Sequence, residues 1–185
     1  DLVASYEAGD NRLNGNFYFV GDTYNNGNNV FVSSDFAENG GNIRPVAWKK
    51  YQNYYKQTDE VQESGINAKV IRYADVLLMM AECANEVRSQ AEAIALINRV
   101  RTRAGLAGLS TTLSKTQVFD AIVQERKVEL CGEQVRFDDI LRWGIASTAL
   151  SGTNFQAGKH ELWPIPDREI ASNPNVTSAD QNPGY

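Results

Sequence analysis

Residues 125–144 read ERKVELCGEQVRFDDILRWG, a stretch in which acidic and basic side chains are crowded together. An acid–base catalytic centre is one use for so many charges, and a network of buried ion pairs is another. Helical periodicity helps to separate these two hypotheses, because it indicates which of the charged side chains face the protein interior.

A helix is predicted from Ser114, with Gln117 at the capping-box position, to about Gly132. Its apolar arc on a helical wheel is formed by Val118, Ile122, Phe119, Leu130 and Val123. Arg126 and Glu129 fall inside this arc, and Glu125 lies on its edge. Part of the charge-rich stretch therefore faces inward.

The preceding helix is predicted from Ser89, which forms a capping-box pattern with Glu92, to about Arg103, and Arg101 falls inside its apolar arc. A charge buried alone is prohibitively costly, so buried charges survive only when they are paired. We therefore expect Arg101 and Arg126 to meet Glu125 and Glu129 between the two helices.

Catalysis by paired carboxylates needs pKa values that are pushed apart. The neighbouring arginines should instead lower the pKa of both glutamates and keep them ionised. A short helix at about 136–143 adds an i,i+4 pair between Asp138 and Arg142. We interpret the charges as a structural ion-pair network whose members are Arg101, Glu125, Arg126, Glu129, Asp138 and Arg142.

The chain is predicted to be a single domain, 1–185, with three regions of different character. Residues 1–66 are loop-rich, with the strand-like pieces NFYFV and NVFVS, and residues 67–144 form a helical core. Residues 145–185 form an irregular tail that carries four of the five prolines. In the first predicted helix, from about Lys69 to Val87, the solvent-facing strip is assigned to Asp75, Glu82 and Glu86.

Composition excludes several functional classes. The net charge of −5 argues against nucleic-acid binding, and no apolar run is long enough to span a membrane. Two cysteines and one histidine cannot form a four-ligand zinc site, so neither a metal nor another cofactor is expected. Cys83 and Cys131 are predicted to be separate buried thiols, with a disulfide left open as an alternative. His160 is predicted to be a surface or locally hydrogen-bonded residue.

Four motifs occur in a characteristic order: VIRYADVLLMMAECANEV (70–87), AIALINRVRTRAGL (93–106), IVQERKVELCGEQVRFDDILRWG (122–144) and LWPIPDREIASNPNVTSADQNPGY (162–185). This series resembles the C-terminal region of the SusD/RagB family, surface glycan-binding lipoproteins of Bacteroidetes. The resemblance covers residues 68–185. One departure is Gln134, which follows Glu133 where the family usually has glycine.

The resemblance implies a mainly α-helical, tetratricopeptide-like superhelical fold with irregular loops and a few short strands. It implies a non-catalytic receptor at the outer-membrane cell surface, beside a SusC-like TonB-dependent transporter. Such a receptor captures oligosaccharide, or peptide in some relatives, for import, and is held to the membrane by a lipid anchor that this chain lacks. A helical scaffold that mainly contacts the transporter is an alternative, and a glycoside hydrolase is a third hypothesis.

Sugars are bound by aromatic faces together with planar polar side chains that match pairs of hydroxyl groups. The loop-rich region contains such a mixture, and its candidate ligand-binding residues are Tyr24, Asn25, Asn26, Trp48, Tyr51, Tyr54 and Tyr55. In the alternative interpretation, Trp48 and Tyr51 pack on the first helix and the Asn-rich segment is a solvated turn.

Overall fold

The computed structural model describes residues 2–36, 46–52, 66–67 and 69–185. Tyr54 and Tyr55 lie outside these residues. Internal contacts divide the chain into two compact units, Asp1–Gly132 and Glu133–Tyr185. The helix that begins at Arg136 therefore belongs to the same unit as the tail, although the sequence grouped it with the helical core.

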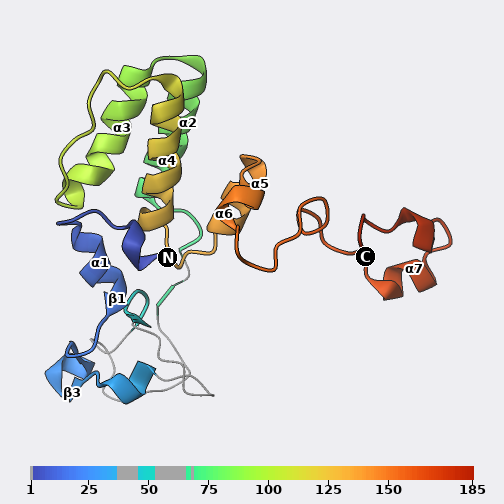
Figure 1. The fold of residues 1–185 in the computed structure, drawn as a ribbon, viewed down its shortest axis with the longest axis horizontal. Coiled ribbons are helices and arrows are strands. Elements are labelled where there is room, and N and C mark those ends of the chain that lie inside the picture. Colours follow the sequence, from blue (N-terminus) through green and yellow to red (C-terminus); the bar gives the residue numbers. More distant parts are fainter. Residues whose placement is uncertain (1, 37–45, 53–65, 68) are drawn as a thin grey trace. The chain divides into compact units, whose positions relative to one another are not determined.

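Three helices dominate the first unit: α2 (Tyr73–Val87), α3 (Gln90–Arg103) and α4 (Lys115–Glu129). They lie side by side in Figure 1, coloured green to yellow, and each contacts the other two. Their shared core consists of fully buried side chains, among them Leu78, Ile94, Ile97, Ile122 and Val118. The expectation of a mainly α-helical fold is confirmed.

Local chemistry explains where these helices begin and end. The Ser114 hydroxyl accepts from the Gln117 N–H at 3.3 Å, and the Gln117 side chain accepts from the Ser114 N–H at 2.9 Å, which completes the predicted capping box. Ser89 caps α3 by accepting from the Glu92 N–H at 3.2 Å. Gly105 follows α3 with φ +81°, a left-handed conformation that suits glycine at a helix end.

The N-terminal part of this unit holds α1 (Asn11–Asn16) and two short antiparallel ribbons. One ribbon pairs β1 (Phe17–Tyr18) with β4 (Ala47–Trp48), and Phe17 is opposite Trp48. The other pairs β2 (Thr23–Tyr24) with β3 (Asn29–Val30). Single 3-10 turns lie at Val3–Ser5, Asn25–Gly27 and Ser33–Phe36. The strand-like pieces of the sequence thus contain β1 and β3.

The second unit contains α5 (Arg136–Arg142), α6 (Ala146–Ala149), α7 (Asp167–Ser172) and a 3-10 turn at Ser178–Asp180. The tail is therefore less irregular than its prolines predict. The His160 Nδ1 accepts from the Gln156 N–H at 2.9 Å, as expected for a locally bonded histidine. Within the described residues, no helix combines the length and apolarity needed to cross a membrane.

Both cysteines are free thiols, which leaves no disulfide between them. Cys131 is buried as expected, whereas Cys83 is exposed and that part of the prediction is wrong. The reason is helical phase: on α2 the neighbouring Ala84 and Asn85 take the buried positions.

Candidate functional site

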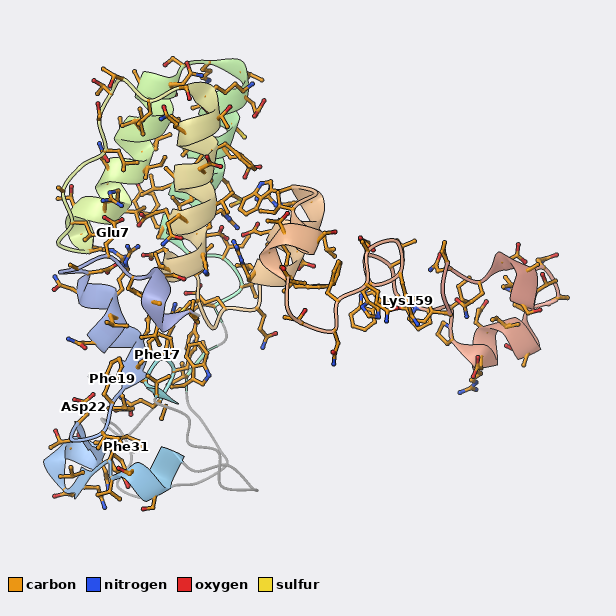
Figure 2. The ribbon with its side chains drawn as sticks, in the orientation of Figure 1. Glu7, Phe17, Phe19, Asp22, Phe31 and Lys159 are labelled. Atoms are coloured by element: carbon orange, nitrogen blue, oxygen red, sulfur yellow. The ribbon has the colours of Figure 1, made fainter. Side chains whose placement is uncertain are left out.

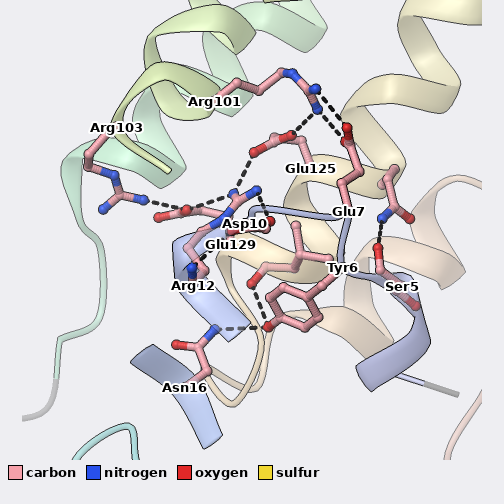
Figure 3. Close-up of polar contacts among 12 residues, drawn as sticks. Ser5, Tyr6, Glu7, Asp10, Arg12, Asn16, Arg101, Arg103, Glu125 and Glu129 are labelled. Carbon is pink, nitrogen blue, oxygen red and sulfur yellow. Dashed lines mark hydrogen bonds and ion pairs between the residues drawn. The ribbon is translucent and has the colours of Figure 1, made fainter. Parts of the chain in front are cut away.

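Glu129, at the C-terminal end of α4, is the centre of a buried ion-pair network (Figure 3). One carboxylate oxygen accepts from Arg72, and the other accepts from Arg12 at 3.1 Å and from Arg103. Its backbone carbonyl accepts from Arg72 at 2.6 Å and from the Lys50 ammonium at 3.1 Å. Side chains from four separate segments of the chain thus converge on one residue.

Glu125, one helical turn earlier, shares Arg12 with Glu129 (Figure 3). Its second oxygen accepts from Arg101 at 3.4 Å. Arg12 also donates from Nε at 2.8 Å and from Nη2 at 2.7 Å to Asp10, which caps α1. This bidentate pair holds the guanidinium group in one orientation. Arg12 therefore connects the N-terminal segment to the helical core.

Arg126 donates to the Asp75 carboxylate of α2 at 2.7 Å. The sequence assigned Asp75 to a solvent-facing strip and paired Arg126 with Glu125 or Glu129. Asp75 is in fact buried. The first expectation is wrong because the packing of α2 on α4 brings Asp75 against an arginine from the neighbouring helix.

Arg101 pairs mainly with Glu7 and only weakly with Glu125. It donates to the two Glu7 oxygens at 2.6 and 2.9 Å, and to the Ala107 carbonyl at 2.9 Å. The expected contact between α3 and α4 is therefore present in part, but a residue of the N-terminal segment supplies the shorter bonds.

In the second unit, Arg142 pairs with Asp139 at 2.9 Å, three residues earlier, rather than with the expected Asp138. Asp139 is buried, while Asp138 is exposed to solvent. The Arg142 guanidinium also lies 4.5 Å from the centre of the Trp143 ring.

The two central glutamates have pKa values shifted in opposite directions. Burial raises the pKa of Glu125 above its ordinary value, and the lowering effects of Arg12 and Arg101 do not cancel it. Burial also acts to raise the pKa of Glu129, but the hydrogen bond from Arg72 and the positive charges around it lower the pKa overall. The expectation that both pKa values lie below the ordinary value therefore fails for Glu125, because burial outweighs its arginines.

Opposed carboxylate pKa values are also a feature of acid–base catalysts. Glu125 and Glu129, however, are each only 2% exposed, and arginines occupy both oxygens of each carboxylate. A substrate would have to displace these arginines to reach either oxygen. The geometry therefore favours a structural role for the pair.

A pH dependence of stability follows from Glu129. Its folded-state pKa lies below the ordinary value of about 4.5, so its stabilising contribution is present above that pH. The contribution is lost as the pH falls through the lower folded-state pKa. We expect the difference in unfolding free energy between wild type and Glu129→Gln to be largest above about pH 5 and to shrink toward pH 2. Urea unfolding across this range measures it, and a difference that is constant with pH would contradict the assignment.

The Trp48 side chain forms the most exposed aromatic surface among the described ligand-binding candidates. Its ring lies 4.9 Å from that of Phe17, and yet it is 53% exposed. The indole edge also lies over Gly132, where an added Cβ would come within 3.1 Å of the ring. One side of the indole is thus supported by the protein, and more than half of its surface faces solvent.

The segment that carries Trp48 is hydrogen-bonded to the end of α4, where the ion-pair network is centred. The Lys50 ammonium donates to the carbonyls of Glu129 at 3.1 Å and Cys131 at 3.0 Å. The Lys49 N–H donates to the Asn16 carbonyl at 2.9 Å. The network therefore helps to fix the position of the Trp48 platform, by which we mean Trp48 with Phe17 and Gly132 beneath it.

Tyr24 lies in a second aromatic cluster, with its ring 4.2 Å from Phe31 and 6.4 Å from Tyr18. Successive side chains of a strand point to opposite faces, so this cluster and the Trp48 platform lie against opposite faces of the β1–β4 ribbon. Figure 2 labels Phe17 of the platform and Phe31 of the Tyr24 cluster. The structure therefore does not bring Tyr24 and Trp48 together.

The other described candidates lie at turns. Asn25 and Asn26 have φ +49° and +56°, and the Asn25 amide donates to Asn29 at 3.1 Å across the β2–β3 turn. Tyr51 is exposed and has φ +68°, which is unusual for an aromatic residue. The Lys69 ammonium lies 5.9 Å from the centre of its ring. The alternative interpretation, in which Trp48 and Tyr51 pack on the first helix, stays a prediction, and both side chains are partly exposed.

Sequence reasoning missed the network members outside the predicted arcs. These are Glu7, Asp10, Arg12, Arg72 and Arg103. Most lie in loops or at helix ends, where no periodicity reports burial. One local signal was present: Asp10 directly precedes α1, and aspartate is a common N-cap residue. Within the described ranges, no group of His, Cys, Asp and Glu has the arrangement of a metal site.

The sequence of this chain is similar to that of SusD-family proteins. A model of the SusD family matches residues 1–185. The SusD-like protein P2 of Formosa agariphila is 33% identical over 166 residues, which is 82% of this chain and 32% of the relative. This chain therefore spans about a third of the length of that relative.

Two solved structures share the architecture. A SusD superfamily protein from Bacteroides vulgatus is 31% identical with a TM-score of 0.76, over 95% of this chain and 40% of that one. A laminarin-binding SusD-like protein is 32% identical with a TM-score of 0.71, over 100% of this chain and 37% of that one.

Proposed function

This chain belongs to the SusD family and has its helical, tetratricopeptide-like fold, and from this premise we propose that it is a non-catalytic glycan-binding component of an outer-membrane uptake complex. It captures oligosaccharide at the cell surface and passes it to a SusC-like TonB-dependent transporter. The likeness to a laminarin-binding relative supports a carbohydrate as the ligand.

The observation that carries this proposal is the Trp48 platform. A flat aromatic ring that is supported from one side and open on the other is suited to stacking on the apolar face of a sugar ring. The support by Phe17 and Gly132 holds the indole in place before a ligand arrives, which reduces the entropic cost of binding. Tyr51, Asn25 and Asn26 remain proposed contacts, as do Tyr24, Tyr54 and Tyr55.

The test is affinity gel electrophoresis of the whole chain on a panel of soluble polysaccharides that includes laminarin, followed by calorimetry. We expect at least one glycan to retard the protein. Retardation by none of them, with retained co-purification of a SusC-like transporter, would favour the scaffold alternative. Release of shorter sugars from the polysaccharide would favour a hydrolase.

We expect Trp48→Ala to weaken glycan binding by roughly 30-fold, since loss of a central aromatic contact costs about 2 kcal/mol. Tyr73→Ala is the matched control, because Tyr73 is 64% exposed on α2 and lies outside the platform. Circular dichroism of each variant separates lost contact from lost folding. Unchanged affinity in a folded Trp48→Ala variant would remove the platform from the proposed site.

A further inference from the structure

A cavity lined by aromatic residues lies entirely within the second unit. Its volume is about 410 Å³, within the range of small-ligand pockets. Four aromatic side chains line it: Phe137, Phe155, Trp163 and Tyr185. The polar residues Asn154 and His160 also belong to the lining. A mainly apolar wall with a few polar groups is typical of ligand sites.

Trp163 is the most exposed aromatic residue of this cavity, with 80% of its surface open. Phe137 and Tyr185 are also exposed large apolar residues, and both line the same cavity. Scattered apolar residues on a surface need no explanation, but a group of them around one hollow marks an interaction site.

The backbone that carries Trp163 is held by the end of the chain. The Trp163 carbonyl accepts from the Asn182 amide at 2.6 Å, and the Leu162 carbonyl accepts from the Tyr185 hydroxyl at 3.1 Å. Gln181 accepts from the Ile165 N–H at 2.7 Å and donates to its carbonyl at 2.9 Å. The exposed indole is therefore carried by an ordered segment, which lowers the cost of using it for binding.

Two prolines and a lysine further restrict the residues around Trp163 and Tyr185. Pro164 and Pro166 restrict the backbone on the C-terminal side of Trp163. The ammonium of Lys159, labelled in Figure 2, lies 4.6 Å from the centre of the Tyr185 ring, a cation–π contact that favours the observed position of this cavity residue.

Two polar groups at the cavity have free hydrogen-bonding capacity. Because the His160 Nδ1 accepts from the Gln156 N–H, the neutral ring carries its proton on Nε2, and no described residue accepts that proton. The Asn154 amide likewise makes no hydrogen bond to any residue that the structure describes. An amide offers both donors and an acceptor, as paired sugar hydroxyl groups require.

From these observations we infer that the second unit contains a carbohydrate subsite, in which the sugar ring stacks on Trp163 and its hydroxyl groups bond to Asn154 and His160. This inference rests on the proposed function and extends it to a second site, separate from the Trp48 platform. An open indole combined with unused donors and acceptors fits a polyhydroxylated ligand better than a purely apolar one.

The experiment is calorimetric titration of the whole chain with a short laminarin-derived oligosaccharide, and affinity electrophoresis on laminarin itself. The variants are Trp163→Ala, Trp163→Phe, Trp48→Ala and the double Ala variant, with Tyr73→Ala as the control. We expect the Trp163→Ala variant to bind one oligosaccharide fewer per chain and to be retarded less on the polysaccharide. Trp163→Phe should retain part of the binding, because a phenyl ring preserves an aromatic face.

Each outcome bears on one proposal or on both. If Trp163→Ala titrates as wild type while Trp48→Ala abolishes binding, the second subsite is overturned and the proposed function stands. A wild-type chain that binds neither laminarin nor its oligosaccharide overturns the subsite, and failure on the whole glycan panel overturns the proposed function as well. If Trp163 fluorescence changes with protein concentration and not with sugar, the face is an interface between copies and the subsite is overturned.

Discussion

Replacement of Glu129 by glutamine is expected to lower the free energy of unfolding by about 3–5 kcal/mol at pH 7, the range for breaking a buried ion pair. Glu129 is 2% exposed, and its carboxylate accepts from Arg12, Arg72 and Arg103. The neutral amide removes the negative charge that compensates these guanidinium groups while keeping the size of the side chain. Urea unfolding followed by circular dichroism measures the loss.

The matched control is Glu86→Gln. Glu86 also pairs with a cationic residue, Lys115 at 2.7 Å, but both side chains are about half exposed. Solvent screens such a pair, so its loss should cost roughly 1 kcal/mol or less. Equal losses in the two variants would mean that the burial of Glu129 does not matter and would contradict the structural role assigned to the network.

Replacement of Arg12 by methionine is expected to destabilise the first unit by a similar amount, about 3–5 kcal/mol. Methionine has comparable length and can fill the space, so the change isolates the charge. It leaves Asp10, Glu125 and Glu129 without a shared donor. Because Arg12 lowers the pKa of Glu125, that pKa should rise further in the variant.

This second prediction tests whether the loop-rich segment is part of the core. Arg88→Met is its control, since Arg88 makes an exposed pair with Glu92 four residues later on the chain. If Arg12→Met unfolds at the same urea concentration as wild type, the N-terminal segment contributes little to the stability of the helices. A carboxyl titration of the variant, followed by NMR, checks the rise in the Glu125 pKa independently.

The two stability variants also bear on ligand binding. Lys50 donates to the carbonyls of Glu129 and Cys131, and Trp48 lies two residues before it. The same end of α4 thus stabilises the fold and supports the Trp48 platform. Backbone carbonyls at the end of α4 therefore help to position the proposed site through Lys50, while the aromatic residues supply the contact surface.

The sequence by itself determined helices α2 to α5, the N-caps of α3 and α4, and the family, but not the short helices α1, α6 and α7. Each of the capping signals is local: Ser114 bonds to Gln117 and Ser89 to Glu92, three residues later, and Gly105 follows shortly after the end of α3. Their effects can therefore be predicted without tertiary structure. Helical periodicity also placed Arg126 and Glu129 in the interior, because it depends on the phase of a single helix.

Only the tertiary structure decided which partners these buried charges have. Periodicity reports the inward face of a helix, but it carries no information about side chains that arrive from a distant loop. Arg12 reaches Glu125 and Glu129 from more than a hundred positions away, and Asp75 became buried only through the packing of α2 on α4. The opposed pKa shifts of the two glutamates depend on the same packing, because burial and nearby charges set them and neither can be read along the chain.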